Sequence, residues 1–148
     1  MDLKSRLKVY EGTQSYQQSR GIFRNGKFYP YKDHLGYLTV GFGHLVLKGE
    51  NYDNGLTPTE ADVLLDKDIS TAKVGLKSLG LSVPKDWEDF LIIMIFQLGV
   101  QGVRNFRKMI AALQVQNYKE AIIQAKDSLW YKQTPKRVDE MISVLQNK

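Results

Sequence analysis

The residues best suited to catalysis are two acids, a threonine and a histidine. Glu11 lies near the N-terminus, and Asp33 is followed by Thr39 and then by the run Gly41-Phe42-Gly43-His44. Hydrolysis of a glycosidic bond needs two carboxyl groups with opposite protonation states, one that protonates the leaving oxygen and one that prepares the nucleophile. This set of residues is the inventory for that reaction with an activated water.

Glu11 is the candidate general acid. A glutamate with the ordinary pKa of about 4.3 is almost fully ionised at neutral pH and cannot donate a proton. Partial burial at a helix end would raise the pKa and keep a protonated fraction. Taken alone, Glu11 is more simply a solvated charge at the end of a helix, and only the accompanying Asp33, Thr39 and His44 favour the catalytic interpretation.

Asp33 and Thr39 are the candidates for placing the attacking water. Asp33, on a turn between strands, should stay ionised, and the Thr39 hydroxyl can hold the same water. Alternatively, Asp33 only bonds its own turn, and Thr39 is a residue with good β-propensity. His34 is tempting as a proton relay, but an exposed turn histidine is the simpler interpretation. We interpret His44 as a structural residue that orients the sheet, and we expect no metal site from two histidines without cysteine.

The bulk properties indicate a globular protein of single-domain size. The chain has 148 residues, of which 43% are hydrophobic and 25% charged, and it lacks cysteine, which suits a reducing compartment. The longest apolar run, Phe90–Phe96, is far shorter than the roughly 20 residues of a membrane span, and residues 1–8 carry no apolar signal segment. The net charge of +5 favours an anionic partner, although the basic residues are scattered.

The pattern of turns and apolar positions predicts an α+β domain with two lobes. A short helix over 2–10 places Glu11 at its C-terminal end, Asn25-Gly26 predicts a hairpin turn, and residues 28–47 predict a small antiparallel sheet. Thr57-Pro58-Thr59-Glu60 is a capping box that begins a long helix.

The remaining helices follow from the same periodicity. A helix opened by Pro84 has an apolar centre that should be buried, and later helices are predicted at about 101–114, 117–127 and 135–146. We expect one domain, with a sheet lobe over about 12–56, an interlobe helix over about 58–79, and a helical lobe over about 80–148 that also includes the N-terminal helix.

Several ordered motifs resemble the phage-type lysozymes, the family of the T-even bacteriophage enzyme. They are Tyr10-Glu11-Gly12, the segment from Tyr31 to Leu45, Leu56–Ala61, Phe96–Gly99 and Trp130–Arg137, which together extend over nearly the whole chain. The resemblance implies a muramidase that cleaves the β-1,4 bond between N-acetylmuramic acid and N-acetylglucosamine in bacterial peptidoglycan. It implies an inverting mechanism, with Glu11 as acid and with Asp33 and Thr39 placing the water.

The resemblance also assigns supporting positions. Leu45, Phe96 and Gln97 match residues that contact the saccharide, although Phe96 is equally plausible as core. Arg137 matches an arginine that lies beside the catalytic glutamate, where its charge would lower the pKa of Glu11 and oppose the effect of burial.

Some positions depart from the family or have a simpler explanation. Met109 replaces a small polar residue and Gln124 replaces an asparagine at two cleft positions. Trp87 and Trp130 would be sugar-stacking platforms in an unknown hydrolase, but both sit in helical apolar patterns, and we expect them to pack in the core.

A longer departure separates Glu11 from Asp33. The family has a short hairpin there, whereas this chain carries an insertion, residues 14–27, which we expect to form an elaborated loop or an extra hairpin. Its aromatic and basic residues suit contacts with sugars or acidic groups. We hypothesise that the insertion shapes the rim of the cleft, with a tolerated surface insertion as the alternative.

These interpretations imply a monomer that needs no cofactor, binds no nucleic acid and does not insert stably into a membrane. It would remain in a host cytoplasm until release to the cell wall, or it would be part of a virion. The first alternative is a lysozyme-fold module that binds wall glycan or a virion partner without cleaving it. A nucleic-acid-binding protein, suggested only by the charge of +5, lacks any recognised motif.

Overall fold

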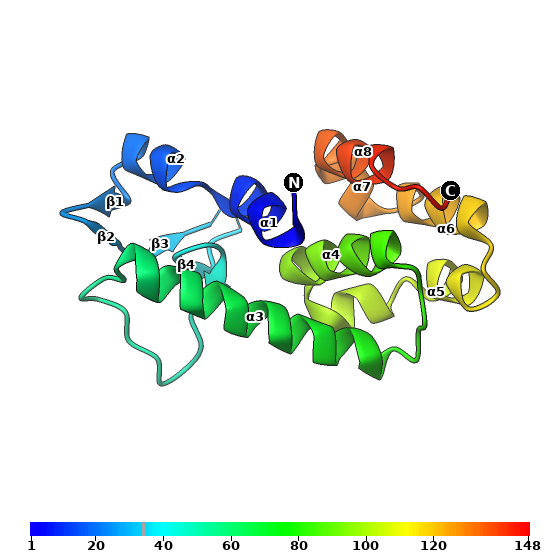
Figure 1. The fold of residues 1–148 in the computed structure, drawn as a ribbon, viewed down its shortest axis with the longest axis horizontal. Coiled ribbons are helices and arrows are strands. Elements are labelled where there is room, and N and C mark those ends of the chain that lie inside the picture. Colours follow the sequence, from blue (N-terminus) through cyan, green and yellow to red (C-terminus); the bar gives the residue numbers. More distant parts are fainter. Residues whose placement is uncertain (34) are drawn as a thin grey trace. The chain divides into compact units, whose positions relative to one another are not determined.

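The computed structural model describes residues 1–33 and 35–148, so the possible relay His34 lies outside the described residues. The chain divides into two compact units, Met1–Ser70 and Thr71–Lys148. The α+β class is confirmed, because short antiparallel strands occur in the first unit and helices make up the second (Figure 1). The division into lobes that the sequence predicts stays a prediction; the N-terminal helix falls within the first unit.

The first unit begins with two helices and continues as short strands. Their bounds are α1 Leu3–Glu11, α2 Gln14–Ser19, β1 Phe23–Arg24, β2 Lys27–Phe28, β3 Tyr31–Lys32, β4 Leu38–Val40 and β5 His44–Leu45. The expected hairpin turn is confirmed, because Asn25 and Gly26 join β1 to β2 with φ values of 52° and 74°. Two successive positive φ values are typical of the type I′ turn that Asn-Gly favours. The insertion thus forms the expected hairpin, but also helix α2, which the sequence did not predict.

Antiparallel pairing of β3 with β4 and of β4 with β5 forms the three-stranded sheet of the first unit. Tyr31 pairs with Thr39, which in turn pairs with Leu45, so these three residues lie side by side across the strands. Nearby, Phe28 contacts Phe23 and Phe42 edge-to-face, with ring centroids 4.7 and 5.0 Å apart. This aromatic cluster packs the insertion hairpin onto the loop between β4 and β5.

The long helix α3, Pro58–Ser78, runs from the first unit into the second. The predicted capping box is confirmed at its start. The backbone N–H of Glu60 donates to the Thr57 hydroxyl at 3.2 Å, and the N–H of Thr57 donates to the Glu60 carboxylate at 2.9 Å. Two backbone donors at the helix N-terminus are thereby satisfied.

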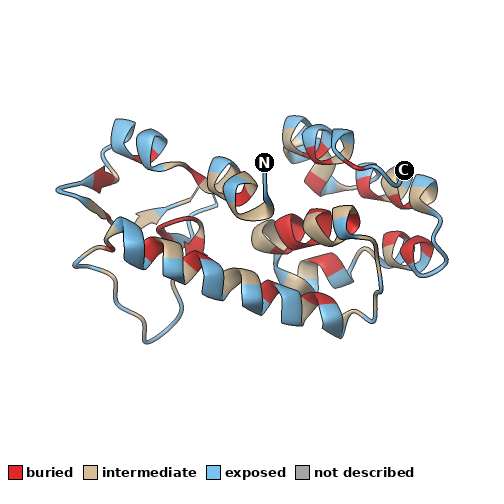
Figure 2. Cartoon of the chain, viewed as in Figure 1, coloured by how far each residue is buried: buried red, intermediate tan, exposed pale blue. Residues whose placement is uncertain are grey.

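The second unit is built around α4, Lys85–Arg104, whose residues Phe90–Ile95 are buried (Figure 2). The later helices are α5 Arg107–Gln114, α6 Tyr118–Lys126, α7 Leu129–Gln133 and α8 Pro135–Ser143. The predicted helix over about 101–114 is instead divided in two, because the segment that follows a break in α4 at Gly99 ends at Arg104 and α5 starts at Arg107. Gly99 has a φ of 71°, a left-handed conformation that interrupts the helix and that glycine adopts without steric cost.

Both tryptophans are buried, as expected for core residues. The exposed fraction is 0% for Trp87 and 5% for Trp130. Each indole N–H has an internal acceptor, the Asn147 carbonyl at 2.7 Å and the Gln97 side-chain oxygen at 2.9 Å. Within the part of the chain that the structure describes, no helix has the length and apolar character needed to cross a bilayer.

Candidate active site

Glu11 is the last residue of α1. The helix stops at Gly12, whose φ is 113° and whose N–H donates to the Lys8 carbonyl at 2.9 Å. The Glu11 side chain is half-buried, and its Oε1 atom is buried. The backbone of Gly43 lies directly against it, because a Cβ atom added to Gly43 would be 2.7 Å from Cγ and 2.9 Å from Oε2 of Glu11. The helix end and the glycine-rich loop therefore enclose this carboxyl group together.

Tyr31 is a functional candidate that the sequence analysis did not single out. The pKa of its phenol is raised to about 12, first by burial and then by the negative charges of Glu11 and Asp33. Its strand partner is Thr39. Tyr31 thus lies within electrostatic range of both candidate carboxyl groups and beside Thr39 in the sheet. The sequence does hold a signal for this, because Tyr31 precedes the candidate Asp33 by only two positions.

Asp33 lies at the turn that follows β3. Its Oδ1 accepts the backbone N–H groups of Leu35 and Tyr37, both at 2.9 Å. The alternative interpretation, that Asp33 forms hydrogen bonds within its own turn, is thus confirmed for these two bonds. They use one oxygen of the carboxylate, and Oδ2 takes no part in these two bonds. The turn therefore fixes the orientation of the carboxylate.

Thr39 lies on β4 and has an exposed fraction of 7%. Its hydroxyl donates to the Tyr37 carbonyl at 3.1 Å, which uses the only proton of that group. A water held by Thr39 would therefore donate to the hydroxyl oxygen and leave its second proton for another acceptor. This direction of hydrogen bonding suits a water that donates one hydrogen bond to Thr39 and transfers its other proton to a carboxylate.

His44 begins β5 and lies between two carboxylates. Its Nδ1 is 2.9 Å from Oδ2 of Asp68, and its Nε2 is 2.9 Å from Oε1 of Glu50. Hydrogen bonding to Asp68 is the main cause that raises the pKa of His44; the bond to Glu50 acts in the same direction and burial opposes them. Both ring nitrogens are engaged, so the imidazole ties β5 to α3. Among the described residues, no group of three or more His, Cys, Asp or Glu side chains is placed to hold a metal ion.

The predicted substrate-contacting and supporting residues are distributed over both units. Leu45 is half-exposed on β5 in the first unit. In the second unit, Phe96 and Gln97 are half-buried on α4, and the Gln97 oxygen accepts the indole N–H of Trp130. Arg137 is half-buried on α8. Their assigned roles stay predictions.

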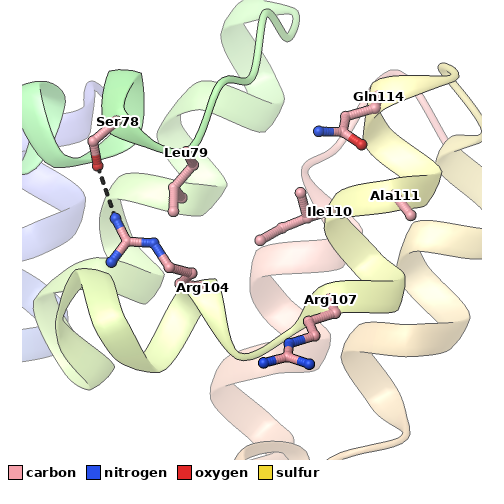
Figure 3. A pocket seen from close by; sticks show the side chains of 7 residues that line it. All are labelled: Ser78, Leu79, Arg104, Arg107, Ile110, Ala111 and Gln114. Atoms are coloured by element: carbon pink, nitrogen blue, oxygen red, sulfur yellow. Dashed lines mark hydrogen bonds between the residues drawn. The ribbon is translucent and has the colours of Figure 1, made fainter.

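Two depressions occur in the second unit. The larger, of about 620 Å³, lies among α4, α5, α6 and α7 and includes the two positions that depart from the family, Met109 and Gln124. The Gln124 amide donates to Glu120 at 2.8 Å. The smaller, of about 390 Å³, is drawn in Figure 3; Arg104 lines it and donates to the Ser78 hydroxyl at 3.2 Å.

Comparison with known proteins decides the family. The sequence model of the family described as phage lysozyme matches residues 23–144. The chain belongs to the phage lysozyme family. Its α+β fold is accordingly lysozyme-like, and the resemblance found in the motifs is confirmed. The family is one of glycoside hydrolases of the lysozyme type, whose substrate is peptidoglycan.

The chain is similar to three curated proteins from two kinds of source, an amoeba and a phage. "Probable T4-type lysozyme 1" and "Probable T4-type lysozyme 2", both of Dictyostelium discoideum, are each 27% identical over an alignment of 143 residues. Each match covers 78% of this chain and 84% of the relative. The "Pre-baseplate central spike protein Gp5" of Enterobacteria phage T4 is 28% identical over 141 residues. That match covers 78% of this chain but 24% of the spike protein, so the similarity is confined to one part of a longer polypeptide.

Proposed function

We propose that this protein is a muramidase that cleaves the β-1,4 bond between N-acetylmuramic acid and N-acetylglucosamine in peptidoglycan. The observation that supports the proposal is that Tyr31 lies beside Thr39 in the sheet and within electrostatic range of Glu11 and Asp33. Two carboxyl groups in different surroundings, one half-buried against Gly43 and one at a turn, offer the asymmetry that acid and base roles require.

Glu11 donates its proton to the glycosidic oxygen, so the bond from that oxygen to the anomeric carbon of N-acetylmuramic acid breaks. A water attacks the same carbon from the opposite face and forms the new carbon–oxygen bond. One of its protons passes to Asp33; the other stays on the new hydroxyl and donates a hydrogen bond to the Thr39 oxygen. The anomeric configuration is thereby inverted, which needs carboxyl groups about 6.5–9.5 Å apart. The residues supply all the proton transfers, and the proposed reaction uses no cofactor.

Glycan contacts are assigned to Leu45 in the first unit and to Phe96 and Gln97 in the second, with Arg137 as a supporting residue. The larger depression of the second unit, which holds Met109 and Gln124, is a further surface for the wall polymer. The net charge of +5 suits a substrate that carries carboxylates or phosphates. We assign a monomer to this function, since one chain carries every group the reaction uses.

The biological role proposed for the chain is lysis of a host or penetration of its wall by a phage. One relative is by name a central spike protein of a phage pre-baseplate, which favours the virion-associated form of the role. An enzyme that waits in the host cytoplasm for release to the wall is the other form.

Digestion of purified peptidoglycan tests the proposal. The intact protein should release fragments with reducing-end muramic acid, identified by mass spectrometry, whereas Glu11→Gln should release none. An initial α-configuration of the new reducing end, observed by NMR, would establish inversion. If neither protein releases fragments and both still bind the wall, the chain is a binding module and the enzymatic proposal is overturned.

A further inference from the structure

Gln17 is a buried amide side chain in α2, within the insertion 14–27. Its exposed fraction is 1%, and the other residues of this six-residue helix are exposed. Glutamine is mostly an exposed residue in folded proteins. Its complete burial in a short polar helix therefore points to a particular use of its amide group.

Both amide hydrogens of Gln17 are donated to backbone carbonyls. Nε2 lies 2.9 Å from the Gly12 oxygen and 2.8 Å from the Gly41 oxygen. Gly12 is the residue directly after Glu11, and Gly41 begins the loop that leads through Gly43 to β5. One side chain thus joins the end of α1 to the loop between β4 and β5.

These two segments are the ones that enclose Glu11. The first fixes the backbone of the carboxyl-bearing residue, and the second presents Gly43 against its Cγ and Oε2 atoms. The helix that carries Gln17 is itself anchored, because Thr13 caps its start and the Ile22 N–H donates to the Gln17 carbonyl at 2.9 Å. A change in the distance between Gly12 and Gly41 would therefore move the Glu11 carboxyl group relative to the backbone of Gly43.

The acceptor end of the amide supports a specific use of this residue. Among the described residues, no donor bonds Oε1 of Gln17, although this atom is buried. A buried acceptor without a partner opposes folding. An apolar side chain of the same size would avoid that cost, so the two donated bonds are what distinguishes glutamine at this position.

We infer that Gln17 is a positioning residue for Glu11, which it holds against Gly43 by joining Gly12 to Gly41. This inference rests on the proposed function, in which Glu11 is the acid. It gives the insertion a role at the catalytic carboxyl group, in addition to the predicted shaping of the cleft rim.

Gln17→Met tests the inference, because methionine keeps the length and volume of the side chain but cannot donate. Gln18→Met, at an exposed position of the same helix, is the matched control. We expect kcat of Gln17→Met to fall about tenfold or more while KM stays within about twofold, because misplacement of a reacting group costs transition-state stabilisation and leaves ground-state binding intact. The control should match the parent protein in both constants.

A second readout does not depend on turnover. With glutamate labelled in its side-chain carboxyl by ¹³C, the NMR titration of Glu11 should change its midpoint in Gln17→Met and not in Gln18→Met. This measurement stays informative if the parent protein proves to be a binding module, so failure of the proposed function and failure of the inference are distinguishable. Equal kcat and equal Glu11 titration in the two variants would overturn the positioning role.

Gln17→Glu covers the case in which Gln17→Met does not fold. The introduced carboxyl group donates one hydrogen bond when protonated and repels both carbonyls when ionised. Its activity relative to that of Gln18→Glu should therefore decline as pH rises through the titration of the new group. A constant ratio over that range would contradict the inference.

Discussion

At the scale of single residues, the closest constraint on the candidate acid is the absence of a side chain at Gly43. Gly43→Ala would place a Cβ atom 2.7 Å from Cγ of Glu11, closer than real contacts allow, at a φ of 84° that alanine adopts at a cost. We expect Glu11 to be displaced and kcat to fall by about 10²-fold. Peptidoglycan cleavage by Gly43→Ala, with Gly36→Ala as control, measures this; among the described residues, no atom lies within 4 Å of a Cβ at Gly36. Equal losses in both variants would assign the effect to backbone strain alone.

Tyr31 makes a second prediction at this scale. Tyr31→Phe keeps the buried ring and removes the phenol that lies near the charges of Glu11 and Asp33. Because an oriented O–H dipole stabilises a neighbouring carboxylate, we expect kcat to fall about tenfold while stability changes by about 1 kcal/mol. The pKa of about 12 keeps the phenol protonated throughout the working range, so the parent pH–rate profile should contain no limb from Tyr31. Unchanged kcat in Tyr31→Phe would exclude any electrostatic role.

His44 makes the unfolding free energy depend on pH. Its pKa in the folded state is raised by Asp68 and Glu50. The stabilisation by the charged imidazole is therefore fully present below its ordinary pKa of about 6.5 and is lost as pH rises through the raised, folded-state pKa. Asp68→Asn should destabilise the protein by about 2 kcal/mol at pH 5.5 and by less at pH 9. Urea unfolding at the two pH values measures the difference, and an equal loss at both would contradict the linkage.

At the scale of elements, the capping box at the start of α3 makes a stability prediction. Thr57→Ala removes the hydroxyl that accepts the N–H of Glu60, and we expect a loss of about 1 kcal/mol in urea unfolding. Glu60→Gln is the matched control, since an amide oxygen still accepts the N–H of Thr57. Peptidoglycan cleavage per folded molecule should be the same in both. A larger loss in Glu60→Gln than in Thr57→Ala would show that charge at the helix N-terminus outweighs the cap.

Elements with strong local signals were predictable from the sequence, and short ones were not. The capping box and a sustained apolar period indicated α3, and Asn25-Gly26 indicated the hairpin between β1 and β2. Helices α2 and α7 have six and five residues, too few to show a helical period. Their formation depends on tertiary contacts and on the caps Thr13 and Ser128.

The candidate site divides in the same way. Glu11, Asp33 and Thr39 were found because residue type and spacing match a family motif. Gln17 gave no signal, because a glutamine in a polar segment looks solvated and its two acceptors are backbone carbonyls of distant residues. Motif spacing can be read from the sequence. The two carbonyls that meet the Gln17 amide come together only in the folded chain.

At the scale of the whole molecule, the scattered positive charge should act on the approach to the substrate and leave the chemical step unchanged. A surplus of +5 attracts anionic wall polymers over a Debye length that shrinks from about 30 Å at 0.01 M salt to about 3 Å at 1 M. We therefore expect kcat/KM on walls that carry anionic polymers to fall steeply with salt, while cleavage of a neutral soluble glycan changes little.

Charge reversal separates this attraction from general salt effects. Lys73→Glu with Lys119→Glu changes two exposed positions on α3 and α6, both in the second unit, whereas the candidate catalytic residues belong to the first. The double variant should lose kcat/KM on anionic walls at low salt, converge with the parent protein at high salt, and keep the same kcat on the neutral glycan. Identical salt profiles for the two proteins would mean that the basic surplus is a solvated surface without a part in substrate encounter. The attraction to the wall would then reside in the residues that bind the glycan directly.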